Sequence, residues 1–136
     1  LVPDLPEQMI AAAPEAFLRN MFRALTSEAG AIEEAAVREY LRVFTLPGTI
    51  RCTLEDYRAA PTRDCADDEA DSHRRVTAPM QVLWGEFGKM HTLFDVLATW
   101  RDKATDVRGR ALPCGHFIPE EAPQALLDEL LPFLAG

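Results

Sequence analysis

The run PMQVLWG, Pro79–Gly85, is an apolar segment that ends at a glycine. A short apolar run of this kind is typical of a strand that is buried on both faces, as in a parallel sheet. Residues 93–104 (LFDVLATWRDKA) follow with the spacing of an amphipathic helix, residues 106–116 (DVRGRALPCGH) with that of a second, weaker strand, and residues 119–136 with that of a final amphipathic helix. Strand, helix, strand and helix joined by short links predict a βαβα segment with parallel strands.

Two strands are too few for a stable sheet that is covered on both faces, because their edges and faces would stay open. We therefore expect the remaining strands to come from outside residues 1–136. The chain also starts at Leu1 rather than at a methionine. This start indicates a piece that lacks its beginning.

The residues before this segment have a helical pattern in short stretches that are punctuated by prolines. Residues 14–25, 31–44 and 46–60 each carry apolar side chains at helical spacing. Asp64–Arg75 is polar and charged, so a solvated helix or loop is expected there. The pattern thus predicts a helical part before an α/β part.

Composition limits the class of protein. With 136 residues, 48% of them apolar, the chain is long enough for one modest core. A formal charge of −8 argues against nucleic acid or an anionic membrane as partner. No run is long enough to span a bilayer, and no signal peptide is visible. Three cysteines without CxxC spacing (Cys52, Cys65 and Cys114) argue against a disulfide framework or a zinc site and favour reduced thiols in the cytoplasm.

His116 is the residue best placed for chemistry. It follows the second predicted strand, and open α/β sheets gather ligands and catalytic groups at the carboxyl ends of their strands. Gly115 allows the backbone a tight exit there, and Phe117 can form a wall beside the histidine. A histidine on such a loop suits proton transfer near neutral pH. One alternative is that His116 only caps the next helix; a pairing with Cys114 is disfavoured, because that cysteine is expected to pack into the sheet.

Three stretches together resemble one family. CTLEDYRAA (residues 52–60), VLWGEFG (residues 82–88) and LPCGHFIPEEAP (residues 112–123) have the order found in α/β-hydrolases of the haloacetate (fluoroacetate) dehalogenase type. The likeness covers nearly the whole chain. It implies the C-terminal portion of an α/β-hydrolase fold, with a partial helical cap at residues 1–63, the last two βα units of the core at residues 64–136, and a sheet that is incomplete without an N-terminal segment.

The resemblance also assigns roles to two residues. It casts His116 as the general base that activates water, and Tyr57 of the DYRA motif as the donor of a hydrogen bond to the departing halide. The alternative for Tyr57 is a core residue on the helix face of Ile50 and Leu54, which would leave its hydroxyl in need of a buried partner. The implied reaction turns a haloacetate into glycolate and halide through an aspartyl ester, with no metal or organic cofactor.

This chemistry needs groups that the chain lacks. A carboxylate must displace the halide, an acid must orient the histidine, and cations must hold the carboxylate of the small haloacid substrate. No nucleophile elbow of the form GxDxG or GxSxG occurs between Leu1 and Gly136. The predicted partner is therefore an N-terminal segment of the same protein that carries the nucleophile; a homodimer is left open.

Two rivals remain. An epoxide hydrolase also combines an aspartate nucleophile with a late histidine and cap tyrosines, but many such enzymes keep their triad acid in a WGxxD pattern, where this chain has Gly88. Glu86 and Asp95 lie nearby and are expected to be a solvated loop residue and an ordinary helix acid. In the second rival, the chain is a non-catalytic fragment if no N-terminal part accompanies it.

Overall fold

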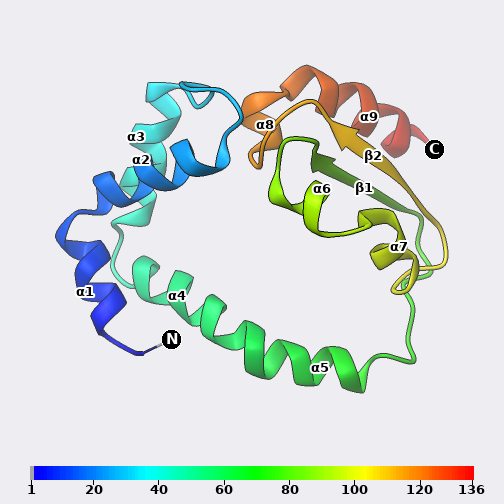
Figure 1. Ribbon diagram of the computed structural model, residues 1–136, viewed down its shortest axis with the longest axis horizontal. Coiled ribbons are helices and arrows are strands. Elements are labelled where there is room, and N and C mark those ends of the chain that lie inside the picture. Colours follow the sequence, from blue (N-terminus) through cyan, green and yellow to red (C-terminus); the bar gives the residue numbers. More distant parts are fainter. Residues whose placement is uncertain (1) are drawn as a thin grey trace. The chain divides into compact units, whose positions relative to one another are not determined.

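The structure, a computed structural model, describes residues 2–136. By internal contacts the described chain divides into a first unit, residues 2–22 and 33–73, and a second unit, residues 23–32 and 74–136. The first unit is helical and contains α1 (Leu5–Ala12), most of α2 (Pro14–Leu25), α3 (Glu34–Phe44), α4 (Thr49–Ala59), the π-helical turn η1 (Ala60–Asp64) and α5 (Cys65–Ala70) (Figure 1). The second holds β1 (Met80–Gly85), α6 (Lys89–Leu93), α7 (Val96–Arg101), β2 (Val107–Leu112), α8 (Ile118–Glu121) and α9 (Pro123–Ala135).

Helices α2 and α3 pack through their apolar faces. Pro14 begins α2, where its fixed φ suits the first helical position and its missing N–H costs nothing. Leu18 of α2 and Val37 of α3 are buried. The ring of Phe17 stacks on that of Phe44 with centroids 5.9 Å apart and planes 7° from parallel. The apolar residues whose spacing predicted these two helices are thus the residues through which the helices pack.

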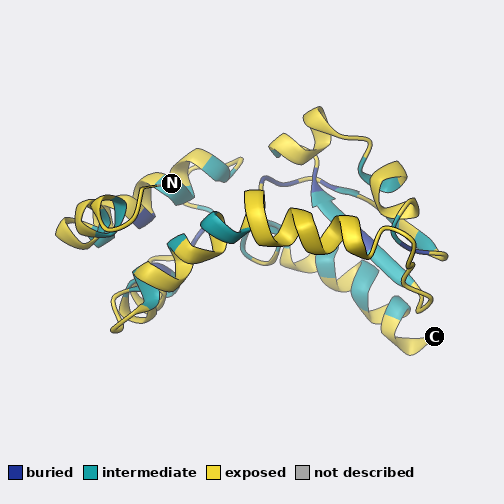
Figure 2. Ribbon diagram, turned by 90° about the horizontal axis from the view of Figure 1, so that it is seen from below, coloured by how far each residue is buried: buried dark blue, intermediate teal, exposed yellow. Residues whose placement is uncertain are grey.

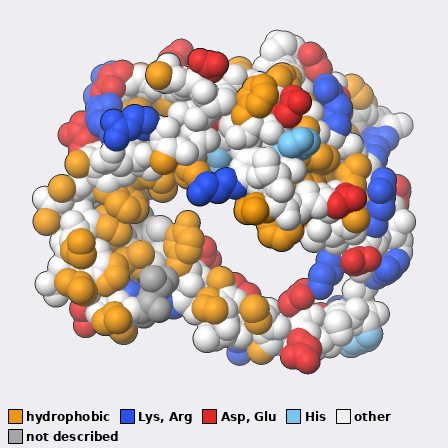
Figure 3. Space-filling model, in the orientation of Figure 1, with side chains coloured by type: hydrophobic (Ala, Val, Ile, Leu, Met, Phe, Trp, Pro, Cys, Tyr) orange, Lys and Arg blue, Asp and Glu red, His pale blue; other side chains and the backbone are white. Residues whose placement is uncertain are grey.

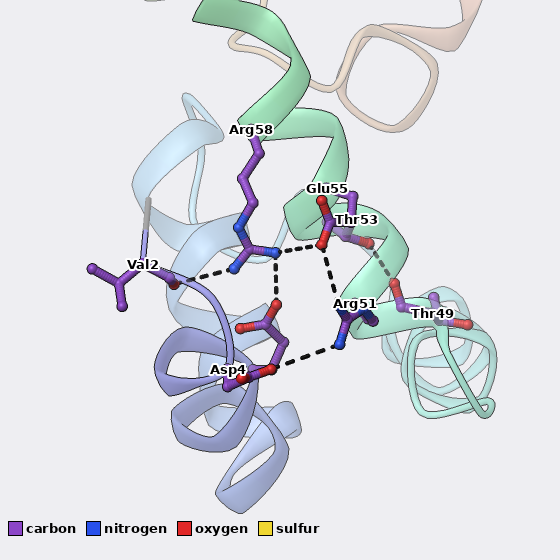
Figure 4. Close-up of polar contacts among 8 residues, drawn as sticks. Val2, Asp4, Thr49, Arg51, Thr53, Glu55 and Arg58 are labelled. Carbon is purple, nitrogen blue, oxygen red and sulfur yellow. Dashed lines mark hydrogen bonds and ion pairs between the residues drawn. The ribbon is translucent and has the colours of Figure 1, made fainter. Parts of the chain in front are cut away.

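An ion pair joins α1 to α4. The guanidinium of Arg58 lies 2.7 Å from Glu7, and the two side chains are only 13% and 15% exposed. Arg58 also donates to Glu55 at 3.0 Å and to the carbonyl oxygen of Val2 at 3.2 Å (Figure 4). The hydrogen bond from Arg58 lowers the pKa of Glu7 from its ordinary value, against the effect of burial. One arginine therefore ties the start of the chain to α4.

Apolar side chains remain exposed on α1. Figure 3 shows hydrophobic side chains on the visible surface of this helix, and Leu5 and Met9 are among the exposed large hydrophobic residues. None of the residues of α1 is fully buried. Within the first unit, polar contacts such as Glu7–Arg58 therefore help to hold α1 in place.

The two strands of the second unit are parallel, as predicted. Their register runs from Met80 opposite Val107 to Gly85 opposite Leu112. Helices α6 and α7 cover one face of this sheet, and α9 covers the other (Figure 2). Within β1 only Val82 and Gly85 are buried. The expected burial of β1 on both faces is thus reached only in part, because a sheet of two strands leaves most side chains half-exposed.

The two predicted helices of the second unit differ from their predicted bounds: the first is shorter, and the second is interrupted. The helix expected over residues 93–104 begins only at Val96, because Phe94 is extended and the side chain of Asp95 caps α7 by accepting from the backbone N–H of Ala98 at 3.0 Å. The final helix is interrupted at Ala122, which has φ −142° and ψ 53°. A residue before proline is driven out of the helical region, and Pro123 follows Ala122.

The charged stretch after α4 is solvated, as expected, and every residue of α5 is exposed. The turn η1 leads α4 directly into α5 across residue 63. The division of the chain into cap and core at that residue stays a prediction. Among the helices of residues 2–136, none has the length and apolar character needed to cross a membrane.

Candidate functional site

His116 lies in the short loop between β2 and α8, at the carboxyl end of its strand. Its side chain is exposed, and its ring meets that of Phe117 edge-on, with centroids 5.1 Å apart. Its backbone N–H donates to the carbonyl oxygen of Leu25 at 2.9 Å. The position at a strand end is the one predicted from the sequence, and it leaves the imidazole free to meet a ligand.

Backbone contact fixes the loops that follow the two strands. The N–H of Glu86 donates to the carbonyl of Leu112 at 2.8 Å, and the N–H of Phe87 donates to the carbonyl of Cys114 at 3.0 Å. A Cβ on Gly85 would lie 1.7 Å from the carbonyl oxygen of Gly115. Any side chain at Gly85 would therefore push the His116 loop away from β1.

The carboxylate of Glu121 joins the His116 loop to Ser27 through hydrogen bonds. Its Oε2 accepts from the N–H of Ser27 at 2.6 Å, from the Ser27 hydroxyl at 2.7 Å and from the N–H of Gly115 at 3.0 Å. Its Oε1 accepts from the N–H of Phe117 at 2.9 Å. Burial by itself would raise the pKa of Glu121, but these hydrogen bonds outweigh it and hold that pKa below its ordinary value.

The helix-capping alternative for His116 is wrong. The N-cap of α8 is Phe117, not His116, and α8 has no capping hydrogen bond from the side chain of its N-cap residue. The N–H of Phe117 is bonded by Glu121 from within the first turn, much as in a capping box. Two glutamates in the first turn indicate the start of a helix, but no local pattern points to Ser27, which is 94 positions away in sequence.

Cys114 packs into the core, as expected. Its side chain is 1% exposed. Burial, and to a lesser degree the charge of Glu121, raises the pKa of the thiol. The reactive form of cysteine is the thiolate, so this residue is not a nucleophile for the site.

Trp84 has a partner that sequence reasoning missed. Its Nε1 donates to Nδ1 of His91 at 3.0 Å, and the two rings are stacked at 6.5 Å. Trp84 also borders an apolar groove of about 380 Å³ between β1 and the helices α6 and α7; its other walls include Val82, Met90, Phe94 and Trp100. His91 is thus exposed, as predicted, but its ring accepts a hydrogen bond from Trp84.

Tyr57 lies on α4 in the first unit. Its side chain is 63% exposed, whereas Ile50 and Leu54 are half-buried. The core alternative for Tyr57 therefore does not describe this side chain. That Tyr57 and His116 face the same substrate cavity stays a prediction, since the two residues belong to different units.

Neither Glu86 nor Asp95, the two acids near Gly88, lies in the His116 loop. Gly88 is the N-cap of α6, Asp95 caps α7, and Glu86 is an exposed loop residue, as predicted for it. Glu86 meets the end of β2 only through its backbone N–H, which donates to the carbonyl oxygen of Leu112. Within residues 2–136, no group of His, Cys, Asp and Glu side chains could hold a metal ion.

Known proteins provide a direct comparison with this geometry. No protein-family model matches the chain. It is 33% identical over 136 residues to a soluble epoxide hydrolase from Corynebacterium sp., covering 98% of this chain and 46% of that protein. It is 31% identical over 131 residues to a fluoroacetate dehalogenase from Burkholderia sp., covering 96% of this chain and 43% of that protein.

A solved structure decides the fold. ALR0039 from Nostoc sp. PCC 7120, provisionally assigned as an alpha/beta hydrolase, superposes with a TM-score of 0.94 at 45% identity, over 98% of this chain and 46% of that chain. The chain has an α/β-hydrolase fold. The predicted fold class, a C-terminal portion with helices before the last βα units, is confirmed. The chain spans less than half the length of these α/β-hydrolases.

Proposed function

We propose that this chain supplies the base and the halide-binding tyrosine of an enzyme that hydrolyses the carbon–halogen bond of a small haloacid. The observation that carries the proposal is the exposed His116 on the strand-end loop, within the GHFIPEE sequence, in an α/β-hydrolase fold. A fluoroacetate dehalogenase among the relatives supports the substrate class. The nucleophile would come from an N-terminal segment of the same protein.

In the first half-reaction, an aspartate of that segment attacks the carbon that bears the halogen. The carbon–oxygen bond of an ester forms while the carbon–halogen bond breaks, and the halide leaves with the bonding electron pair. Tyr57 donates a hydrogen bond to the halogen as its charge develops. A donor of this kind acts most strongly in the transition state, where it lowers the barrier rather than only improving binding.

In the second half-reaction, His116 takes a proton from water as the water oxygen attacks the ester carbonyl. The ester bond then breaks, the departing glycolate oxygen takes up the proton that His116 holds, and the aspartate carboxylate is regenerated as the remaining proton of the attacking water is released to solvent. His116 is suited to this role because an imidazole exchanges protons near neutral pH. Only this half-reaction needs the base, so the two steps can be separated by experiment.

The test uses the full-length protein with fluoroacetate and chloroacetate, in a single turnover in ¹⁸O-labelled water. We expect stoichiometric halide release, with the label in a protein carboxylate and not in the first glycolate formed. Label in the glycolate would mean direct attack by water and would overturn the ester mechanism.

Epoxide hydrolysis is the second candidate, favoured by the relative of that name in Corynebacterium sp.. It would also use an ester intermediate and a late histidine, but Gly88 occupies the place where many such enzymes keep the triad acid. Incubation of the same full-length protein with styrene oxide separates the two. Diol formation without halide release from the haloacids would select the epoxide hydrolase.

A further inference from the structure

We propose that Glu121 is a positioning residue that fixes the backbone on both sides of His116 against residues 25–27. The contacts that fix the loop all lie within residues 2–136. The effect of these contacts on catalysis rests on the proposed function. Glu121 touches no reacting atom in this proposal. It acts by fixing the position of the His116 imidazole.

The contacts form a bridge with His116 at its centre. Gly115 precedes the histidine and Phe117 follows it, and the N–H groups of both donate to the Glu121 carboxylate, at 3.0 and 2.9 Å. The same carboxylate accepts two hydrogen bonds from Ser27, at 2.6 and 2.7 Å. The N–H of His116 itself reaches Leu25. Three consecutive backbone N–H groups of the loop are therefore bonded, two of them through one side chain.

A carboxylate is the group that this bridge needs. Both of its oxygens accept hydrogen bonds, and here both do. A glutamine has one acceptor oxygen and a donor amide, so its NH₂ would face either Phe117 or Ser27, where donors already point. Leaving a partly buried N–H without its acceptor is costly. The lowered pKa of Glu121 agrees with a carboxylate that stays ionised at neutral pH.

The consequence for catalysis falls on one half-reaction. A base displaced by about 1 Å can lose about 100-fold in rate, whereas attack by the N-terminal aspartate needs no base. We therefore expect Glu121→Gln to slow ester hydrolysis by about 10- to 100-fold while the halide burst keeps its rate and amplitude. A general loss of folded protein would instead reduce the burst amplitude.

The experiment compares full-length wild type, Glu121→Gln and the matched control Asp128→Asn. Asp128 is an exposed residue of α9, and its carboxylate accepts from the amide of Gln124 at 2.8 Å. Two quantities are measured: the halide burst with mass spectrometry of the ester on chloroacetate, and amide hydrogen exchange at Ser27, Gly115 and Phe117. In Glu121→Gln we expect an intact burst, an accumulating ester and faster exchange at these amides; in Asp128→Asn we expect wild-type behaviour.

Two results would overturn the proposal: wild-type ester hydrolysis with unchanged exchange in Glu121→Gln, or a burst that falls in proportion to ester hydrolysis. If the wild type forms no ester at all, the proposed function fails. Amide exchange then still decides the loop role, since faster exchange at Gly115 and Phe117 supports it and unchanged exchange refutes it.

Discussion

The backbone N–H of His116 donates a hydrogen bond of 2.9 Å to the carbonyl oxygen of Leu25, the last residue of α2. The final carbonyl groups of a helix have no partner within that helix, so they need donors from elsewhere. Here the donor is the residue proposed as the general base. The end of a helix early in the chain thus takes part in setting the loop at residues 113–117.

Gly115→Ala tests how tightly this loop is held. A Cβ there would lie 2.6 Å from both the Leu25 carbonyl oxygen and the Ser27 nitrogen, and 2.9 Å from a Glu121 oxygen. Backbone atoms must then move apart, and we expect a loss of about 1–3 kcal/mol in the free energy of unfolding together with slower ester hydrolysis. Urea denaturation of the full-length protein measures the first effect.

Gly88→Ala is the matched control, since its Cβ would lie 3.2 Å from its nearest neighbour and its backbone is extended. It should lose clearly less stability than Gly115→Ala. Equal losses in the two variants would contradict the close packing of the loop on residues 25–27.

His116→Asn separates the half-reactions. Because the attacking carboxylate needs no base, this variant should release halide once per active site and then stall as a carboxymethyl ester. A rapid-quench halide assay with mass spectrometry of the protein detects both events. His73→Asn, an exposed histidine of the first unit, should turn over normally. A variant at His116 with neither burst nor adduct would place the histidine before ester formation and end the mechanism proposed here.

Tyr57→Phe should slow halide release itself. Loss of one donor to the developing charge is expected to cost about 2–4 kcal/mol in the barrier, most for fluoride, the strongest acceptor. Since Tyr57 is exposed, the thermal midpoint should hardly change. Stopped-flow halide detection with fluoroacetate and bromoacetate gives the comparison.

Tyr40→Phe is the control for this variant, because Tyr40 packs its ring against Phe22 at 5.7 Å in the first unit. Removal of its hydroxyl should leave halide release at the wild-type rate. If the two tyrosine variants behave alike, Tyr57 has no special role toward the halide.

Glu7→Gln tests the pH dependence of stability. The pKa of Glu7 is lowered on folding from an ordinary value of about 4.5 by its bond with Arg58. The resulting stabilisation is present above that ordinary value and is lost as pH falls through the lowered one. Wild type should thus lose more stability between pH 6 and pH 3 than Glu7→Gln does, measured as urea midpoints.

The control is Glu33→Gln at the N-cap of α3, where the glutamate makes no capping bond. Its midpoints should follow the wild type at every pH. A Glu7→Gln protein with the full acid sensitivity of the wild type would show that the Arg58 pair contributes nothing to it.

The parallel sheet and the place of His116 could be predicted because both depend on local pattern. An apolar run closed by a glycine marks a strand, and the following polar loop marks the carboxyl end where ligands gather. The break before Pro123 was also readable, since proline restricts the residue before it. The cap of Asp95 on α7 was less so, because aspartate occurs in helices as well as at their starts.

The bridge made by Glu121 could not be predicted in the same way. Its partner Ser27 is 94 positions away, and neither residue stands out in its own segment. Such a contact follows from how residues 23–32 pack with residues 74–136, which no local periodicity encodes. The same limit applies to the Trp84–His91 bond, where each residue alone resembles an ordinary aromatic or surface side chain.

The contact between Gly85 and Gly115 has a consequence for how the His116 loop can be redesigned. A Cβ on Gly85 would meet the backbone of residues 114 and 115, whereas a Cβ on Gly115 would meet Leu25, Ser27 and Glu121. Neither glycine can therefore be replaced without moving the loop, and a change in the shape of the site must come from neighbouring side chains. Phe87, which is exposed, lies two residues after Gly85, and Phe117, which is half-buried, lies two residues after Gly115. Libraries meant to broaden activity should vary these two phenylalanines and keep both glycines.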